Sequence, residues 1–169
     1  ACTVWGMEFR QFELPMGGVP SGSTNAYLLG EEPALLVDPG GRTPALDFAV
    51  SDATVGAIAV THTHPDHVGA LAHYATVTDA TVCARRWRAG RFERATGVAP
   101  DRTVVEGDTV QTGSSVARVL DTPGHAVDHL AFETPAGIVC GDLAIATGSL
   151  AVVVPGGALR ADLTSPPRL

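Results

Sequence analysis

The sequence predicts one α/β or α+β domain spanning residues 1–169, and three observations carry this prediction. The length of 169 residues is that of one ordinary domain, which buries roughly 70% of the surface of its unfolded chain. A hydrophobic content of 45%, with 19 glycines and 12 prolines, excludes disorder and suits a fold with many loops. Segments with strand and helix character alternate in the first half, and strands dominate the second half.

The first part of the chain predicts three strands and a helix. Val4–Leu14 is rich in apolar residues and has the composition of a strand. Asn25–Leu29 and Ala34–Val37 flank a Gly-Glu-Glu-Pro turn, a pattern typical of a hairpin. A threonine cap, Thr43, with proline at the first helical position predicts a short helix at Pro44–Val50.

A buried strand followed by an amphipathic helix is predicted in the middle of the chain. Val55–Val60 is a continuous apolar run, typical of a strand covered on both faces. Val68, Leu71, Ala72 and Ala75 then recur at helical spacing. The remaining predicted elements are strands at Thr81–Ala84, Thr103–Val110, Ser115–Leu120, Leu130–Glu133 and Ile138–Cys140, and a helix at Arg85–Ala95.

Charge and cysteine content narrow the function classes. The net charge is −7, which argues against nucleic acid and acidic membrane surfaces as partners. All 11 basic residues are arginine, so lysine Schiff-base chemistry and a phosphate-binding P-loop are excluded. No apolar run approaches the length of a membrane span. Three cysteines without a CxxC pair favour a reducing compartment, and we expect a cytoplasmic protein.

A dense group of metal-type residues follows the buried strand. His62, His64 and His67 lie within six positions, with Asp66 among them. Residues two apart in an extended segment point the same way, and Pro65 then begins a helix whose first turn carries Asp66 and His67. One strand-to-helix turn can therefore present four ligands to one cavity. Imidazole and carboxylate together favour Zn²⁺, with Fe²⁺ or Mn²⁺ as alternatives.

Four motifs together resemble the metallo-β-lactamase fold superfamily, in its glyoxalase II and lactonase branch. Residues 62–67 match the HxHxDH signature, residues 122–125 the next histidine motif, residues 140–142 the segment with the bridging aspartate, and residues 36–40 the strand-end Asp-x-Gly. The resemblance implies a four-layer αββα sandwich, here abbreviated at its C-terminal end.

The resemblance also implies roles for single residues. His62, His64 and His125 would hold a first metal ion, Asp66 and His67 a second, and Asp142 would bridge them. Asp38 would orient a ligand imidazole from outside. The match has a gap, because no histidine follows His129 to complete the second site. A weak or empty second site, completion by a neighbouring subunit in a homo-oligomer, and an incomplete chain all stay open; Ala158–Leu163 favours the last.

These residues predict a metal-dependent hydrolase that acts on a small-molecule thioester, lactone or related ester. Metal-bound hydroxide would be the nucleophile, with one or two Zn²⁺ ions as cofactor, and Asp66 would be the catalytic residue that orients the hydroxide and returns a proton. One alternative is an oxidoreductase like the persulfide dioxygenases of this fold, with one Fe²⁺ held by two histidines and an aspartate. A non-catalytic domain that keeps the fold is a third hypothesis.

Several other residues carry two interpretations each. His129 is a substitute metal ligand or a structural histidine, and His73 is expected to be solvated. Cys83 and Cys140 are expected to be small buried hydrophobes. The glycine-rich loop Met16–Ser23 borders the mouth of the active site or is an ordinary connection. Five arginines recognise an anion or form a solvated helix face with Trp87 and Phe92 packed inward: Arg85, Arg86, Arg88, Arg91 and Arg94.

Overall fold

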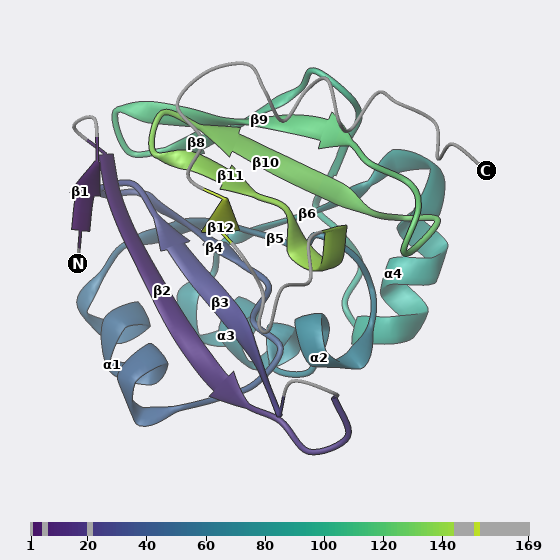
Figure 1. The fold of residues 1–169 in the computed structure, drawn as a ribbon, viewed down its shortest axis with the longest axis horizontal. Coiled ribbons are helices and arrows are strands. Elements are labelled where there is room, and N and C mark those ends of the chain that lie inside the picture. The colour runs from purple at the N-terminus through teal and green to yellow at the C-terminus, as the bar shows by residue number, and fades with distance from the viewer. Residues whose placement is uncertain (1, 5–6, 20–21, 144–150, 153–169) are drawn as a thin grey trace.

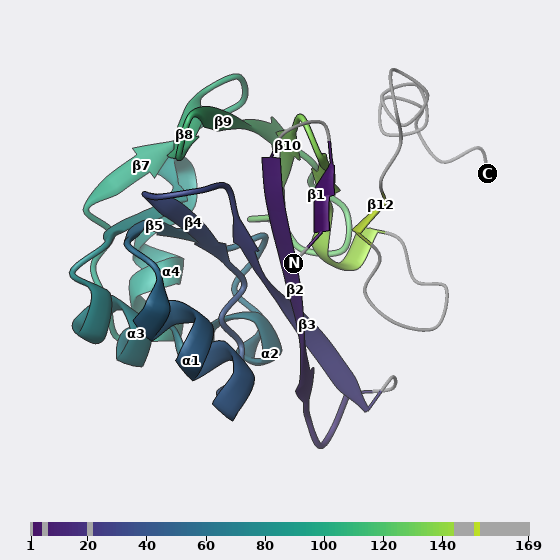
Figure 2. The ribbon, with the colours of Figure 1, turned by 90° about the vertical axis from the view of Figure 1, so that its left-hand side faces the viewer.

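Two β-sheets and a layer of helices form the described part of the molecule (Figures 1 and 2). The structure is a computed structural model that describes residues 2–4, 7–19, 22–143 and 151–152. A seven-stranded sheet has the order β1-β2-β3-β4-β5-β6-β7, and a five-stranded sheet has the order β12-β11-β10-β9-β8. The first sheet consists of β1 (Cys2–Val4), β2 (Met7–Pro15), β3 (Ser23–Leu29), β4 (Ala34–Val37), β5 (Val55–Ala59), β6 (Thr81–Arg85) and β7 (Arg102–Val104).

The second sheet is antiparallel throughout. It consists of β8 (Thr109–Thr112), β9 (Ser115–Asp121), β10 (Leu130–Thr134), β11 (Gly137–Val139) and β12 (Ala151–Val152). In the first sheet β1 to β4 form an antiparallel meander, whereas β4 to β7 are parallel. The helices that connect the parallel strands are α1 (Pro44–Asp52), α2 (Pro65–Val68), α3 (Leu71–Thr78), η1 (Arg86–Arg88) and α4 (Ala89–Thr96); η2 (Gly141–Leu143) follows β11.

Strand alternation explains the layers. Leu28 and Leu36 face the helices and pack with Leu46 and Phe92 in one core, because successive side chains of a strand point to opposite faces. Their neighbours Leu29 and Leu35, with Val37, face the second sheet, where they pack with Val119, Phe132 and Val139. The order of layers is therefore helices, first sheet, second sheet, which confirms the mixed α/β sandwich (Figure 2). The C-terminal abbreviation and Ala158–Leu163 lie outside the described residues.

Most predicted elements are present, but the structure divides some of them. Val4–Leu14 is not one strand, because Val4 ends β1 and pairs with Met7, where the antiparallel strand β2 begins. Thr103–Val110 is not one strand: a turn with Gly107 at φ 85° separates β7 in the first sheet from β8 in the second. The predicted helix after His67 is two short helices, because the Ala70 amide donates to the Pro39 carbonyl at 2.9 Å and Ala72 faces solvent. Within the described ranges, no helix is long and apolar enough to cross a membrane.

The predicted cap of α1 is present and can be tested. Thr43 has extended backbone geometry, and its Oγ1 accepts a hydrogen bond from the Leu46 amide at 3.2 Å. Replacing Thr43 by alanine removes one of the few acceptors for the free amides of the first turn. We expect Thr43→Ala to lower the free energy of unfolding by about 1 kcal/mol, measured by urea denaturation, whereas Thr43→Ser should stay close to the original protein.

Candidate metal centre

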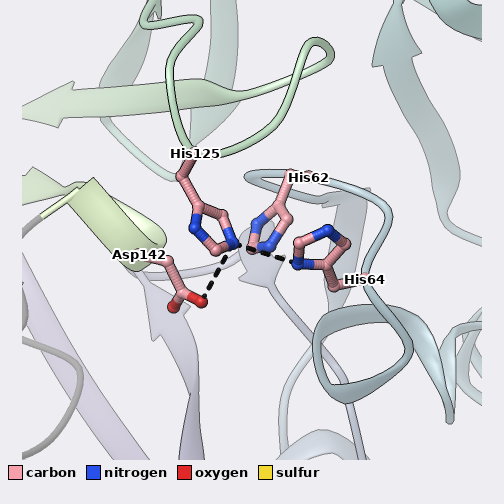
Figure 3. A group of neighbouring side chains, drawn as sticks. All are labelled: His62, His64, His125 and Asp142. Atoms are coloured by element: carbon pink, nitrogen blue, oxygen red, sulfur yellow. Dashed lines mark hydrogen bonds and ion pairs between the residues drawn. The ribbon is translucent and has the colours of Figure 1, made fainter.

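The candidate site lies where several strands of both sheets end. The loop after β5 carries His62 and His64, the loop after β9 carries His125, and η2 after β11 carries Asp142. Figure 3 shows these four side chains pointing toward one common space. The segments are far apart in the sequence, and the two sheets bring their ends together. The sandwich thus builds one site from loops that no single motif contains.

A first group of four side chains could hold a metal ion. One ligand atom from each of His62, His64, His125 and Asp142 lies within 4.8 Å of all the others. The His125 Nε2 atom is 3.0 Å from His64 Nδ1 and 3.4 Å from Asp142 Oδ2. Two imidazole lone pairs cannot face each other at this distance without a proton or a cation between them. The predicted members of the first site are therefore brought together.

A second group shares Asp142 with the first. The His67 Nε2 atom lies 3.5 Å from Asp66 Oδ2 and 3.3 Å from Asp142 Oδ1, and the three residues form the second candidate ligand group. Asp142 thus directs Oδ2 toward the first group and Oδ1 toward the second. This placement is what the predicted bridging position requires.

His62 is buried and neutral. Burial, reinforced by the nearby His67, lowers the pKa of His62 to about 2, so that the imidazole carries no charge at pH 7. The Thr61 hydroxyl donates to Asp38 Oδ2 at 2.7 Å and lies 3.1 Å from His62 Nδ1. The hydroxyl oxygen can therefore accept a hydrogen bond from the Nδ1–H group of His62, which leaves the Nε2 lone pair free. This buried Nε2 has no hydrogen-bond partner among the described residues, as a metal ligand would require.

Asp38 controls the orientation of His67. The Asp38 carboxylate is 1% exposed; its Oδ2 lies 2.9 Å from His67 Nδ1, and its Oδ1 accepts from the Thr61 amide at 2.6 Å. Burial alone would lower the pKa of His67, but Asp38 and Asp142 outweigh it and raise this pKa to about 10. A hydrogen bond from His67, opposed by burial, lowers the pKa of Asp142 to about 2. Asp38 thus contacts an imidazole, as the resemblance predicts, and the role of His67 as a metal ligand stays a prediction.

This donor set fits a metal cation. Without an ion, the proton on His67 is the positive charge between two carboxylates, and a cation bound to Nε2 would replace that proton. Neutral histidines with one nitrogen held by a hydrogen bond, together with ionised carboxylates, are the usual ligands of Zn²⁺ and of Fe²⁺. The buried Nε2 of His62, which has no hydrogen-bond partner among the described residues, agrees with this.

Gly141 allows Asp142 to approach the first sheet. Its φ is +50°, and a Cβ atom there would lie 2.5 Å from the Thr61 hydroxyl and 2.8 Å from His129 Nε2. Only a residue without a side chain fits this contact comfortably. The glycine before the predicted bridging aspartate is thus required by the space between the two sheets.

The two candidate groups do not include His73, His129, Cys83 or Cys140. His129 is fully buried, its Nδ1 is 2.8 Å from the Thr122 hydroxyl, and its ring stacks on His62 with a centroid separation of 5.1 Å. Burial lowers the pKa of His129 to about 4. His129 belongs to neither candidate ligand group, and its Nε2 has no hydrogen-bond partner among the described residues, so both interpretations of this residue stay open. Cys83 and Cys140 are buried, as predicted.

The glycine-rich loop borders a cavity next to Asp66. The cavity has a volume of about 560 Å³, and residues 16–19 line it together with Asp66 and His73. The first interpretation of this loop, that it lies beside the site, agrees with the structure. His73 is half-buried and lines the cavity, so the expectation that it is solvated stays a prediction.

The segment with the five arginines matches neither the predicted anion-binding surface nor the predicted solvated helix face completely. Phe92 is buried, as expected, but Trp87 is 73% exposed, so its predicted inward packing was wrong. The reason is that η1 interrupts the helix, and its three-residue turn shifts the face on which Trp87 lies. Arg85 pairs with Asp121 at 2.5 Å and Arg91 with Asp128 at 3.4 Å. These two arginines thus contact the connection between β9 and β10, which carries His125.

Comparisons with known proteins agree with the fold and the site. A family model described as the metallo-beta-lactamase superfamily matches residues 19–166. A hydroxyacylglutathione hydrolase of Rhodospirillum rubrum is 39% identical over 116 residues, which cover 67% of this chain and 43% of the relative. The protein of the same description from Idiomarina loihiensis is 31% identical over 119 residues, 70% of this chain and 44% of the relative. The chain thus spans less than half the length of these curated relatives.

Solved structures show the same architecture. The crystal structure of ETHE1 from Myxococcus xanthus is 30% identical, with a TM-score of 0.64 over 82% of this chain and 59% of that one. The BLEG-1 B3 metallo-beta-lactamase is 25% identical, with a TM-score of 0.63 over 81% of this chain and 74% of that one.

Proposed function

The chain belongs to the metallo-beta-lactamase superfamily, and from this premise we propose that it carries the metal centre of a hydrolase that cleaves thioesters. The superfamily fold implies metal binding, and the His/Asp groups of this chain are the candidate site. The observation that carries the proposal is the placement of Asp142, whose two oxygens each face one of the two ligand groups.

The substrate class rests on the curated relatives. Those described above are hydroxyacylglutathione hydrolases, and the name specifies a thioester of a hydroxy acid as the bond that is cleaved. We propose the same class of thioester for this chain, with lactones and related esters as the neighbouring class. The cavity beside Asp66, bordered by residues 16–19, supports a small-molecule partner of this size.

Six side chains would form the proposed centre. The first ion would be held by His62, His64 and His125, the second by Asp66 and His67, and Asp142 would contact both. When bound, Zn²⁺ lowers the pKa of water toward 7 and polarises the carbonyl oxygen of an ester. Thr61 and Asp38 keep the nitrogens of His62 and His67 directed into the site.

Proton transfer falls to a carboxylate of this chain. Hydrolysis adds the oxygen of water to the acyl carbon, breaks the carbon–sulfur bond and leaves a thiolate that needs a proton. The Asp66 carboxylate is half-buried and lines the cavity, so that it can contact both water and a leaving group. We propose that Asp66 holds the attacking water by a hydrogen bond, takes its proton and returns it to the sulfur.

Metal content and hydrolysis test this function together. The purified protein should contain zinc or a comparable metal by elemental analysis, and it should hydrolyse an S-hydroxyacylglutathione in a thiol-release assay. Dialysis against a chelator should remove activity, and added Zn²⁺ should restore it. His62→Ala and Asp66→Ala should abolish turnover, whereas Asp52→Ala, an exposed residue at the end of α1, should not. Turnover that survives complete metal removal would refute the proposal.

A second candidate is an iron-dependent oxygenase. The first ligand group alone offers histidines and a carboxylate, which is the donor set of mononuclear iron enzymes that activate O₂. The likeness to ETHE1 at 30% identity keeps this candidate alongside the hydrolase. One equivalent of iron per chain with oxygen uptake on a persulfide substrate would favour it, and zinc with thioester cleavage would eliminate it.

A further inference from the structure

A buried carboxylate outside both ligand groups connects the two loops that carry the proposed ligands. Asp128 is 4% exposed. Its Oδ2 accepts two hydrogen bonds from Thr63, one from the amide at 3.0 Å and one from the hydroxyl at 2.6 Å. Thr63 lies between His62 and His64, and Asp128 lies three residues after His125. The contact therefore joins segments that are 65 residues apart.

The direction of the Thr63 side chain explains why this contact matters. In an extended segment the first and third side chains point to one face and the second points to the other. When His62 and His64 face the site, Thr63 must face away from it, and there Asp128 meets it. Fixing the Thr63 side chain and amide on this far face therefore fixes the direction of both imidazoles.

Arg91 of α4 contacts both Thr63 and Asp128. Its Nε donates to the Thr63 hydroxyl at 2.9 Å and lies 3.4 Å from Asp128 Oδ1. A buried carboxylate is unfavourable unless it is paired with a charge or fully hydrogen-bonded. Arg91 supplies the charge, and its side chain keeps access to solvent at 45% exposure. Among the described residues, Asp128 Oδ1 has no hydrogen-bond partner, and its charge is balanced by the contact with Arg91.

We propose that Asp128, together with Thr63 and Arg91, is a positioning device that sets the distance between His125 and the His62–His64 pair. This inference rests on the proposed function, because it assigns a role toward the metal ion of that centre. None of the three residues belongs to either candidate ligand group. They act by holding His64 Nδ1 and His125 Nε2 within the 3.0 Å seen here. Loss of such an outer partner lowers metal affinity by about 10- to 100-fold in comparable sites.

Cobalt binding tests the device without relying on turnover. Co²⁺ would be titrated into the metal-free protein, with the dissociation constant and the visible spectrum as readouts and urea unfolding in chelator as the measure of stability. We expect Asp128→Ala to weaken Co²⁺ binding about 10- to 100-fold and to alter the spectrum. Asp128→Asn keeps an acceptor for Thr63 and should restore most of the affinity.

The matched control is Asp101→Ala. Asp101 Oδ2 also accepts a hydrogen bond from a backbone amide, that of Val82 at 2.8 Å. This contact lies at the start of β6, whereas the site follows the end of the neighbouring parallel strand β5. This variant should lose stability and keep the original Co²⁺ affinity. If Asp128→Ala does not fold, Thr63→Val removes only the hydroxyl contacts and should weaken Co²⁺ binding in the same direction.

The outcomes separate the two proposals. If the original protein binds neither Co²⁺ nor Zn²⁺, the metal centre itself is refuted and the positioning role falls with it. If the original protein binds Co²⁺ and Asp128→Ala binds it within about twofold with an unchanged spectrum, only the positioning role is overturned. The role is also overturned if Asp101→Ala weakens binding as much as Asp128→Ala does, since the effect would then reflect general stability.

Discussion

Replacing Asp142 by asparagine is expected to remove one full equivalent of metal from the protein and to abolish hydrolysis. The carboxylate directs Oδ1 toward His67, 3.3 Å away, and Oδ2 toward His125, 3.4 Å away. Asparagine has the same shape but only one oxygen and no charge, so that it cannot serve both ligand groups. Because loss of an outer partner alone costs 10- to 100-fold in metal affinity, loss of the shared ligand should cost about 100-fold or more.

Elemental analysis and Co²⁺ titration of Asp142→Asn would measure this directly. Asp101→Asn is the control, since Asp101 contacts the start of β6, at the opposite end of the parallel strands from the site, and belongs to neither ligand group. The metal-free variant should remain folded, because Asp142 is only half-buried and Asp38 still pairs with His67. Retention of the original stoichiometry and affinity in Asp142→Asn would show that this residue is not shared by two ions.

The local part of the site could be predicted from sequence because its spacing is short. His62, His64, Asp66 and His67 follow one strand, and the strand-to-helix turn alone places them on one side. His125 and Asp142 needed the resemblance, since nothing in their spacing specifies that η2 and the loop after β9 meet the end of β5. That meeting depends on how two sheets pack, which a pattern of apolar residues does not encode.

Contacts that depend on loop geometry could not be predicted from the sequence. Thr63 and Asp128 look like ordinary polar residues beside more conspicuous histidines, and their pairing exists only because two distant loops are apposed. For Thr61 the sequence holds a weak indication of a role at the site, because its hydroxyl directly follows a buried apolar strand. The errors have a related cause, because each assigned one regular element to a segment that changes its structure within a few residues. The predicted helix around Trp87 contains the 3-10 turn η1, and the predicted strand 103–110 contains the turn at Gly107.

Asp38→Asn should weaken both the fold and the metal centre. The carboxylate accepts hydrogen bonds from the Thr61 amide, the Thr61 hydroxyl and His67 Nδ1, and it is buried. An amide group offers one oxygen, and its nitrogen would then face another donor. Asparagine is the informative replacement because Asp38 has a φ of +52°, a conformation that asparagine tolerates and alanine does not. The effect therefore reports on the hydrogen bonds and not on backbone strain.

We expect Asp38→Asn to lower the free energy of unfolding of the metal-free protein by about 3 kcal/mol and Co²⁺ affinity by about 10- to 100-fold. The pKa of His67 should fall, because burial would then act without the opposing carboxylate of Asp38; a proton NMR titration would follow it. Asp47→Asn is the matched control, since Asp47 accepts from Tyr74 at 2.7 Å in the helical layer and lies outside both ligand groups. An Asp38→Asn protein with unchanged Co²⁺ affinity and an unchanged pKa of His67 would show that the imidazole is held in place without this carboxylate.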